Sequence, residues 1–239
     1  MRATASLSVV RRGGRDVIAD QRSHAPFSLR RCGTKVLLAS SAAAPVGGDD
    51  LSMTIDVGPG ATASIGSVAA TMVWPGPSGA PSSMVTSCTV GAGAHLDLHL
   101  EPTVSVAASD HHARTVIDLA ADATCRVIDE VALGRRGEPS GRLALSQRVT
   151  RAGRPLLHHD ETFGPDVAGA LSSVSIGAAR FALSAVFVGI DAGSSRTIVE
   201  SDGAAAWLPV ADDAAVALLA SHDRPAALRL FGRLCPEFA

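Results

Sequence analysis

A short segment between positions 95 and 101 alternates polar and apolar residues. On a β-strand successive side chains point to opposite faces, so the polar residues would share one face and three leucines the other. Next-but-one strand residues lie roughly 6.5–7 Å apart, so neighbours could hold an ion only by leaning together or by passing it along. Imidazole and carboxylate groups suit a borderline divalent ion such as nickel or zinc. The candidate metal residues are therefore His95, Asp97, His99 and Glu101, and the alternative is an ordinary solvent-facing strand.

Three further clusters contain residue types that bind metals or transfer protons. His111-His112 and the segment 158–161 place histidines side by side, and adjacent strand residues face opposite ways, so neither pair chelates alone. We expect these histidines in loops. Asp129-Glu130 would put one carboxylate on each side of a strand, either in solvent or in a polar channel or interface.

Common catalytic signatures are missing from the sequence. It contains no GxxxxGK[ST] phosphate loop, no HExxH, no GxSxG and no CxxC. The Gly58-Pro-Gly60 triplet is followed by a period of two rather than by a helix, so it does not indicate a dinucleotide site. Four cysteines without paired spacing favour reduced, mostly buried thiols in a reducing compartment.

The elements that carry these residues are predicted to be strands. Leu51, Met53, Ile55 and Val57 alternate with polar residues, and a turn at 58–60 leads to a second strand over 61–65. Similar units follow, each with a strand, a turn of small residues and a strand. Their anchors are Val57, Val90 and Leu119, about 30 residues apart. This repeat predicts stacked β layers in which each unit buries one face against its neighbour.

The C-terminal part changes character. Strands are expected over 179–190 and 196–200, followed by one short helix from Asp212-Asp213 to Ala220. Asp223 and Pro225 indicate a second helix start, with Leu228, Phe231 and Leu234 on one face. We therefore predict a mainly β protein of stacked, β-helix-like or sandwich-like sheets, forming a single domain over 1–239 with two short helices near 212–234.

Composition limits the possible partners. The 239 residues are 46% hydrophobic and 18% charged, with a net charge of −2, so no global basic field favours nucleic acid. No apolar run reaches the ~18 residues that a membrane span needs. Arg11-Arg12 is followed by no apolar segment, so we expect no signal peptide and a cytoplasmic protein. The first 35 residues nevertheless hold seven arginines and Lys35 against two aspartates, which indicates either an acidic partner or a solvated strand edge.

Several short motifs occur in an order that resembles the UreD (UreH) family of urease accessory proteins. The stretch 67–74 departs from the family pattern, which is richer in threonine and glutamine and ends in Lys-Val-Tyr, and 134–138 is a contracted form of another family element. The matching motifs are Val46-Gly-Gly-Asp-Asp-Leu51, Val57-Gly-Pro-Gly-Ala61, Ala69-Ala-Thr71, Val90-Gly-Ala-Gly-Ala94, Leu96-Asp97, Glu101-Pro102-Thr103 and Leu133-Gly-Arg135.

The resemblance implies a non-enzymatic scaffold that joins apo-urease to a UreF-type protein and a UreG-type GTPase. It implies that nickel passes through an internal channel to the urease active site and that no cofactor is tightly bound. Asp97 and Glu101 fall on family-matching positions, whereas His95 and His99 do not. The alternatives are a hydrolase or lyase that uses Asp97 and Glu101, or Asp129 and Glu130, as a carboxylate pair, and a structural adaptor that never contacts nickel.

Overall fold

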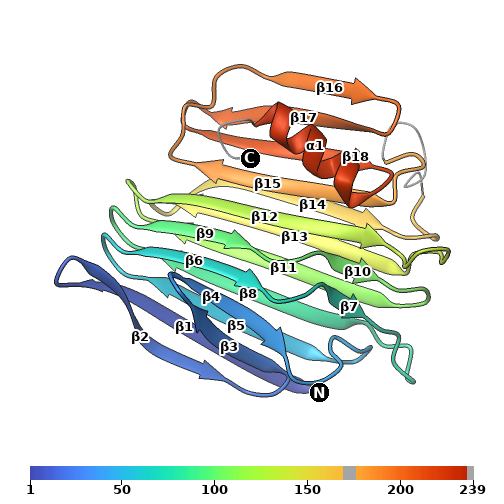
Figure 1. Cartoon of the computed structure of the whole chain (residues 1–239), viewed down its shortest axis with the longest axis horizontal. Coiled ribbons are helices and arrows are strands. Elements are labelled where there is room, and N and C mark those ends of the chain that lie inside the picture. The colour runs from blue at the N-terminus through green and yellow to red at the C-terminus, as the bar shows by residue number, and fades with distance from the viewer. Residues whose placement is uncertain (169–175, 236–239) are drawn as a thin grey trace.

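The computed structural model describes residues 1–168 and 176–235, and their strands form two stacked sheets (Figure 1). Sheet A has seven strands in the order β14-β13-β11-β8-β5-β1-β2. Their bounds are β1 Arg2–Arg12, β2 Arg15–Ser23, β5 Asp50–Val57, β8 Ser82–Val90, β11 Asp110–Leu119, β13 Arg142–Arg151 and β14 Arg154–Phe163.

Sheet B lies over sheet A and has eleven strands, nine of them in the order β16-β17-β18-β15-β12-β9-β6-β4-β3. The remaining two are short: β10 pairs with β12, and β7 pairs with β10. The bounds are β3 Phe27–Cys32, β4 Lys35–Ser40, β6 Thr62–Ser67, β7 Thr71–Val73, β9 His95–His99, β10 Thr103–Ser105, β12 Thr124–Leu133, β15 Phe181–Val188, β16 Arg196–Glu200, β17 Gly203–Ala211 and β18 Ala214–Ser221.

The predicted repeat is the organising feature of both sheets. Each unit sends one strand into sheet A and the next into sheet B, so that β5, β8 and β11 stack in parallel, as do β6, β9 and β12. The anchors are in register, because Val57 pairs with Val90 and Val90 with Leu119. Gly60 and Gly93 occupy equivalent turns with φ of 65° and 61°, a backbone conformation that favours glycine. The expectation of a mainly β, stacked-sheet fold is confirmed.

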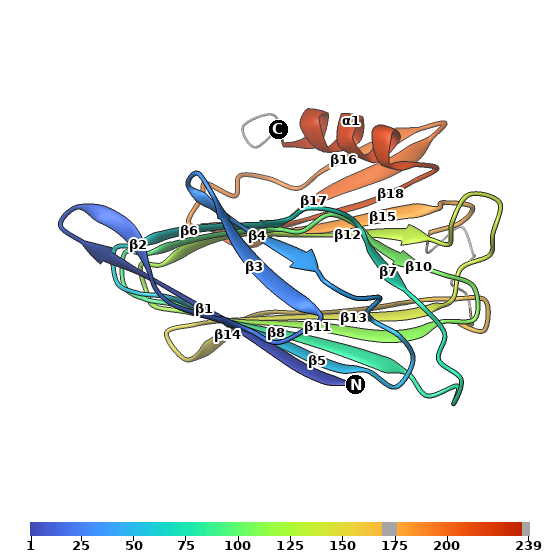
Figure 2. The same cartoon turned by 60° about the horizontal axis from the view of Figure 1, so that its bottom comes forward.

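The inward side chains of the two sheets form the main core. Ile55, Leu96, Ile117 and Val127 are fully or almost fully buried there, and the alternation of β5 and β9 follows directly from this one-sided burial. Figure 2 shows the two layers edge-on, with helix α1, Arg224–Leu234, lying outside the layer of β15, β17 and β18.

The C-terminal expectation is half right. Asp223 caps α1 by accepting a hydrogen bond from the backbone N–H of Ala226 at 2.9 Å, as the sequence predicted. The helix expected over 212–220 is wrong, because Ala214–Ser221 forms strand β18. The residues of β18 are almost all apolar because one face of the strand contacts the main core and the other lies beneath α1. A strand buried on both faces loses the period of two, and a short apolar run then looks helical.

Of the three residues expected on one face of this helix, Phe231 and Leu234 are buried as predicted and Leu228 is not. Leu228 is 44% exposed, whereas Ala227, Leu230, Phe231 and Leu234 pack on sheet B. Among the described residues no helix has both the length and the apolar character needed to cross a bilayer. The prediction of a single domain over 1–239 stays a prediction.

Candidate functional site

The polar residues of the 95–101 segment line the outer face of sheet B, as the alternation predicts. His95, Asp97 and His99 point outward from β9, while Leu96 and Leu98 are buried in the main core. Glu101 follows the end of β9. The structure divides these four residues into two pairs with different surroundings.

His95 and Asp97 form the first pair, together with neighbouring strands. His95 Nδ1 lies 2.7 Å from the hydroxyl of Thr124. The Asp97 carboxylate accepts hydrogen bonds from Arg126 Nε at 2.8 Å and Ser64 Oγ at 3.0 Å. Burial acts to raise the pKa of Asp97. The hydrogen bonds from Arg126 and Ser64, together with the positive charges of Arg126 and Lys35, outweigh this effect, so the pKa is lowered overall. Two cationic side chains therefore already act on this carboxylate.

His99 and Glu101 form the second pair beneath the start of α1. His99 Nε2 lies 2.6 Å from Oε1 of Glu130, whose side chain is fully buried. Arg224 donates to Glu130 through Nε at 2.6 Å and pairs with Glu101 through Nη1 at 2.9 Å. Burial would raise the pKa of Glu130, but hydrogen bonds from His99 and Arg224 lower it overall. Two carboxylates and an imidazole thus gather around one guanidinium.

A break in sheet B lies beside this second group. β9 pairs with β12 as far as His99 opposite Ile128, and β10 resumes the pairing at Thr103 opposite Val131. The intervening β12 residues are Asp129 and Glu130, and residues 100–102 lie outside both ladders. A void of about 50 Å³ occupies this place and is lined by Asp129, Glu130 and Glu101. The void is thus lined by residues that point to both faces of the sheet.

Asp129 lies on the inner side of the break. Its Oδ2 accepts a hydrogen bond of 2.6 Å from Gln147 Nε2 of β13, which links the two sheets. Burial raises the pKa of Asp129, while Gln147 and the charge of His99 only partly oppose this effect. Within residues 1–168 and 176–235, no arginine or lysine forms an ion pair with this carboxylate. A cation beside it would therefore relieve an uncompensated burial cost.

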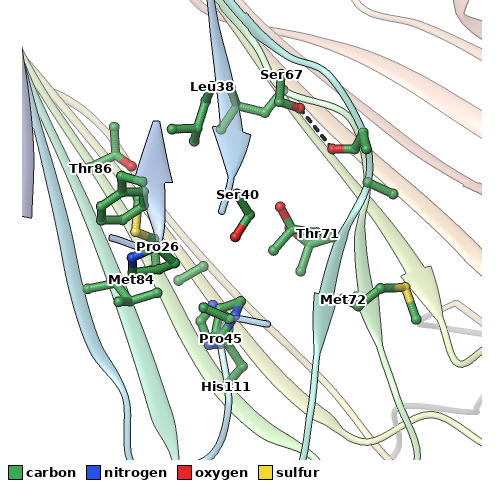
Figure 3. A pocket seen from close by; sticks show the side chains of 18 of the residues that line it. Pro26, Leu38, Ser40, Pro45, Ser67, Thr71, Met72, Met84, Thr86 and His111 are labelled. Atoms are coloured by element: carbon green, nitrogen blue, oxygen red, sulfur yellow. Dashed lines mark hydrogen bonds between the residues drawn. The ribbon is translucent and has the colours of Figure 1, made fainter. Parts of the chain in front are cut away.

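A larger cavity of about 370 Å³ opens between the sheets next to the same void. Leu100, Thr103, Ala113, Thr115 and Asp129 line both spaces. Figure 3 shows the side chains of Ser40, Thr71, Thr86 and His111 around the cavity. Most of its wall is apolar, and its polar lining residues also include Ser67 and the cationic Arg114. The mouth lies between the chain at 39–45 and the chain at 67–72.

His111 is a polar residue of this cavity that the sequence interpretation missed. It was expected in a loop but lies on β11, 2% exposed, with Nδ1 2.8 Å from the hydroxyl of Ser82. Burial, helped by the neighbouring His112, lowers the pKa of His111 to about 4. The imidazole is thus neutral at pH 7 and can offer a lone pair. The histidines at 158 and 159 likewise lie on a strand, β14, rather than in a loop.

Comparison with known proteins assigns the chain to one family over nearly its whole length. The family model described as UreD urease accessory protein matches residues 1–236. The chain belongs to the UreD family of urease accessory proteins.

Several named relatives agree with this assignment. Urease accessory protein UreD of Parafrankia sp. (strain EAN1pec) is 35% identical over 237 residues, covering 88% of this chain and 80% of the relative. The UreD protein of Frankia alni is 36% identical over 198 residues, covering 76% of this chain and 61% of the relative. UreD 1 of Saccharopolyspora erythraea is 37% identical over 167 residues, covering 66% of each chain. Membership in the UreD family supports a role in urease maturation. The relatives are named accessory proteins, which is consistent with a non-enzymatic role.

Two UreD-like motifs have clear structural positions. Glu101-Pro102-Thr103 spans the break in sheet B, between β9 and β10. In Val46-Gly-Gly-Asp-Asp-Leu51, the Asp49 carboxylate accepts a hydrogen bond from the backbone N–H of Val46 at 2.8 Å and pairs with the amino group of Met1. The first motif thus lies at the candidate site, whereas the second holds the start of β5 in place.

The structure does not bring either proposed carboxylate pair together as an acid–base dyad. Asp97 and Glu101 each bond a different arginine, Arg126 and Arg224. Asp129 and Glu130 project from opposite faces of β12. Among the described residues, no group of three or more His, Cys, Asp or Glu side chains is arranged to hold a metal ion.

Proposed function

We propose that this UreD protein is a nickel-insertion chaperone and scaffold. In this proposal it bridges apo-urease and UreF-type and UreG-type partners in the cytoplasm and helps to conduct nickel to the urease active site. Nickel is cargo here, and no tightly bound cofactor is invoked. Neither nucleic acid nor a membrane is a partner. The observation that supports the conduit is Asp129, a half-buried carboxyl group that lines both the internal cavity and the void at the break in sheet B.

The route begins in the cavity between the sheets. Neutral His111 and the hydroxyls of Ser40, Thr71 and Thr115 offer ligand atoms along a mostly apolar wall, to which Arg114 also contributes. Asp129 supplies charge where the cavity meets the break. Scattered single ligands suit passage because an ion bound by many groups at once would be released slowly.

The outer end of the route is the group of His99, Glu101 and Glu130. An ion arriving there competes with Arg224 for two carboxylates, so its hold is weak and reversible. His95 and Asp97 would bind a passing cation less well, because Arg126 and Lys35 place positive charge next to Asp97. Of the four sequence candidates, we therefore assign the stronger roles to Glu101 and His99.

The test is nickel delivery in cells that make urease and all its accessory proteins. Asp129→Asn keeps the size and the hydrogen bond from Gln147 but removes the charge, and we expect several-fold less nickel per urease. Asp56→Asn removes an exposed charge from β5 and serves as the matched control. Urease and accessory proteins should still co-purify with both variants.

Two outcomes would contradict the proposal. Normal nickel occupancy in Asp129→Asn and in Glu101→Gln would leave a structural adaptor that never contacts the metal. Normal occupancy after deletion of the whole chain would remove even the scaffold role.

A further inference from the structure

Part of the basic excess of the first 35 residues lies at one end of the molecule, at the turns of two hairpins. The turn between β1 and β2 and the turn between β3 and β4 form the tips of two hairpins there (Figure 2). Between them lies a groove of about 470 Å³. Its cationic lining residues are Arg15, Arg31 and Lys35, all exposed. Three of the eight basic residues noted in the sequence thus line a concave surface.

Few acidic groups balance this groove. Asp16 lines it too, but its carboxylate already pairs with Arg11 Nη1 at 3.1 Å. Arg31 donates through Nε to the carbonyl oxygen of Gly33 at 3.2 Å, which leaves its positive charge unneutralised. In the part of the chain that the structure describes, no carboxylate forms an ion pair with Arg15 or Lys35. The groove therefore carries a net positive charge.

The groove is lined by the interior strands β4 and β6 of sheet B and by two sheet-edge strands, β2 and, through Arg31, β3. β2 is the last strand of sheet A, and β3 is the last strand of sheet B. Each edge strand has backbone N–H and C=O groups directed away from its own sheet, to which an extended chain can add. No aromatic residue lines the groove, so it offers no platform for stacking nucleic-acid bases.

We propose that this basic groove docks an extended acidic segment of a partner protein. Carboxylates of the segment pair with Arg15, Arg31 and Lys35, and its backbone runs along an edge strand. The inference goes beyond the proposed function, because it depends on the charge and shape of this end alone and not on nickel passage.

The experiment measures binding of a defined probe by the purified chain. The probe is a fluorescein-labelled peptide of alternating glutamate and valine. The control is a peptide of the same length and label that alternates lysine and valine. We expect the acidic peptide to raise fluorescence anisotropy and the basic peptide to leave it unchanged. Added salt should weaken binding, because exposed charges are screened.

Variants locate the site. The triple variant Arg15→Gln, Arg31→Gln, Lys35→Gln should weaken binding about tenfold, since three exposed charge pairs of modest individual strength are lost. Arg148→Gln with Arg154→Gln removes exposed positive charge from β13 and β14, at the far side of sheet A, and should bind as the unaltered chain does. Circular dichroism checks that each variant is folded, and single substitutions replace the triple variant if it is not.

Three outcomes would overturn the inference. They are no binding of the acidic peptide by the folded chain, equal loss in the far-side variant, and a preference for single-stranded DNA or phosphatidylserine vesicles over the peptide. Because the assay contains neither nickel nor urease, its failure would leave the nickel-delivery proposal standing, and failure of that proposal would leave the groove untouched.

Discussion

Asp129 and Glu130 are adjacent on β12, yet their hydrogen bonds run to opposite faces of sheet B. Gln147 of sheet A lies 2.6 Å from Asp129 Oδ2, and Arg224 of α1 lies 2.6 Å from Glu130 Oε2. The period of two makes this division unavoidable on a strand. What is particular here is the break in the ladder beside them, where both residues line one small void.

The first prediction concerns the pH dependence of stability in Asp129→Asn. Burial raises the pKa of Asp129 in the folded protein. The protonated carboxyl is therefore favoured on folding, and this contribution is lost as pH rises from its ordinary value through the raised one. The free energy of unfolding of the variant, relative to the unaltered protein, should therefore increase between pH 4 and pH 8.

Urea unfolding at a series of pH values measures this difference. Asp56→Asn, on the exposed face of β5, is measured in parallel as the control for the loss of a carboxylate. A flat profile for Asp129→Asn would mean that the folded protein does not disfavour the charged carboxylate.

The second prediction concerns Glu130→Gln. The fully buried carboxylate joins His99 and Arg224, and a neutral amide removes the charge that both partners face. We expect a loss of about 2 kcal/mol in the free energy of unfolding at pH 7. The loss is limited because Arg224 still forms its ion pair with Glu101 in the variant. Since the pKa of Glu130 is lowered on folding, the loss should shrink as pH falls through that lowered value.

Chemical denaturation at pH 7 and in acid provides the comparison. Asp202→Asn breaks the exposed pair with Arg229 and should cost about 0.5 kcal/mol or less. A loss for Glu130→Gln no larger than this control would show that the group beneath α1 does not stabilise the fold.

Local sequence patterns predicted much of this fold and only one part of the site. Alternation around Ile55 and Leu98 gave the strands, and the spacing of Val57, Val90 and Leu119 gave their stacking, because burial of one face imposes a period of two. The same logic misassigned Ala214–Ser221, whose strand is buried on both faces.

The site depends on contacts that no local pattern contains. Arg224 reaches Glu130 across 94 positions in the sequence, and Gln147 reaches Asp129 from the opposite sheet. A histidine pair such as His111-His112 reveals no burial, so its inward member was indistinguishable from a surface residue. The adjacent Asp129-Glu130 pair was the one sequence feature that pointed to the site. Burying a carboxylate on each side of a strand costs free energy unless each is hydrogen-bonded or paired, so such a pair indicates polar partners on both faces.

The third prediction tests the closure beside the cavity mouth. Gly76 and Gly47 approach closely where residues 74–81 meet the chain after Pro45, and a Cβ at Gly76 would lie 2.7 Å from the carbonyl carbon of Gly47. Gly76→Ala should therefore displace one segment and destabilise the protein by about 2 kcal/mol or more.

Thermal unfolding compares this variant with Gly79→Ala. Gly79 has open space for a Cβ but a φ of +67°, so its substitution should cost only about 1 kcal/mol through backbone strain. Equal costs for the two would indicate that the close approach of the two glycines does not constrain the mouth.

The fourth prediction separates a conduit from a scaffold. Ala113 of β11 lines both the large cavity and the void at the break, so a leucine there would project into the space through which an ion must pass. Filling an existing cavity with apolar atoms should change the free energy of unfolding by less than about 1 kcal/mol. Nickel per urease should nevertheless fall several-fold, with partner co-purification unchanged.

Ala113→Ser is the matched control, because it adds a single small polar atom and leaves the passage open. Metal analysis of urease purified from cells carrying each variant gives the readout. If Ala113→Leu folds, retains its partners and delivers a normal amount of nickel, the ion does not cross sheet B at this break. The carboxylates around it would then serve only to hold α1 against the sheet.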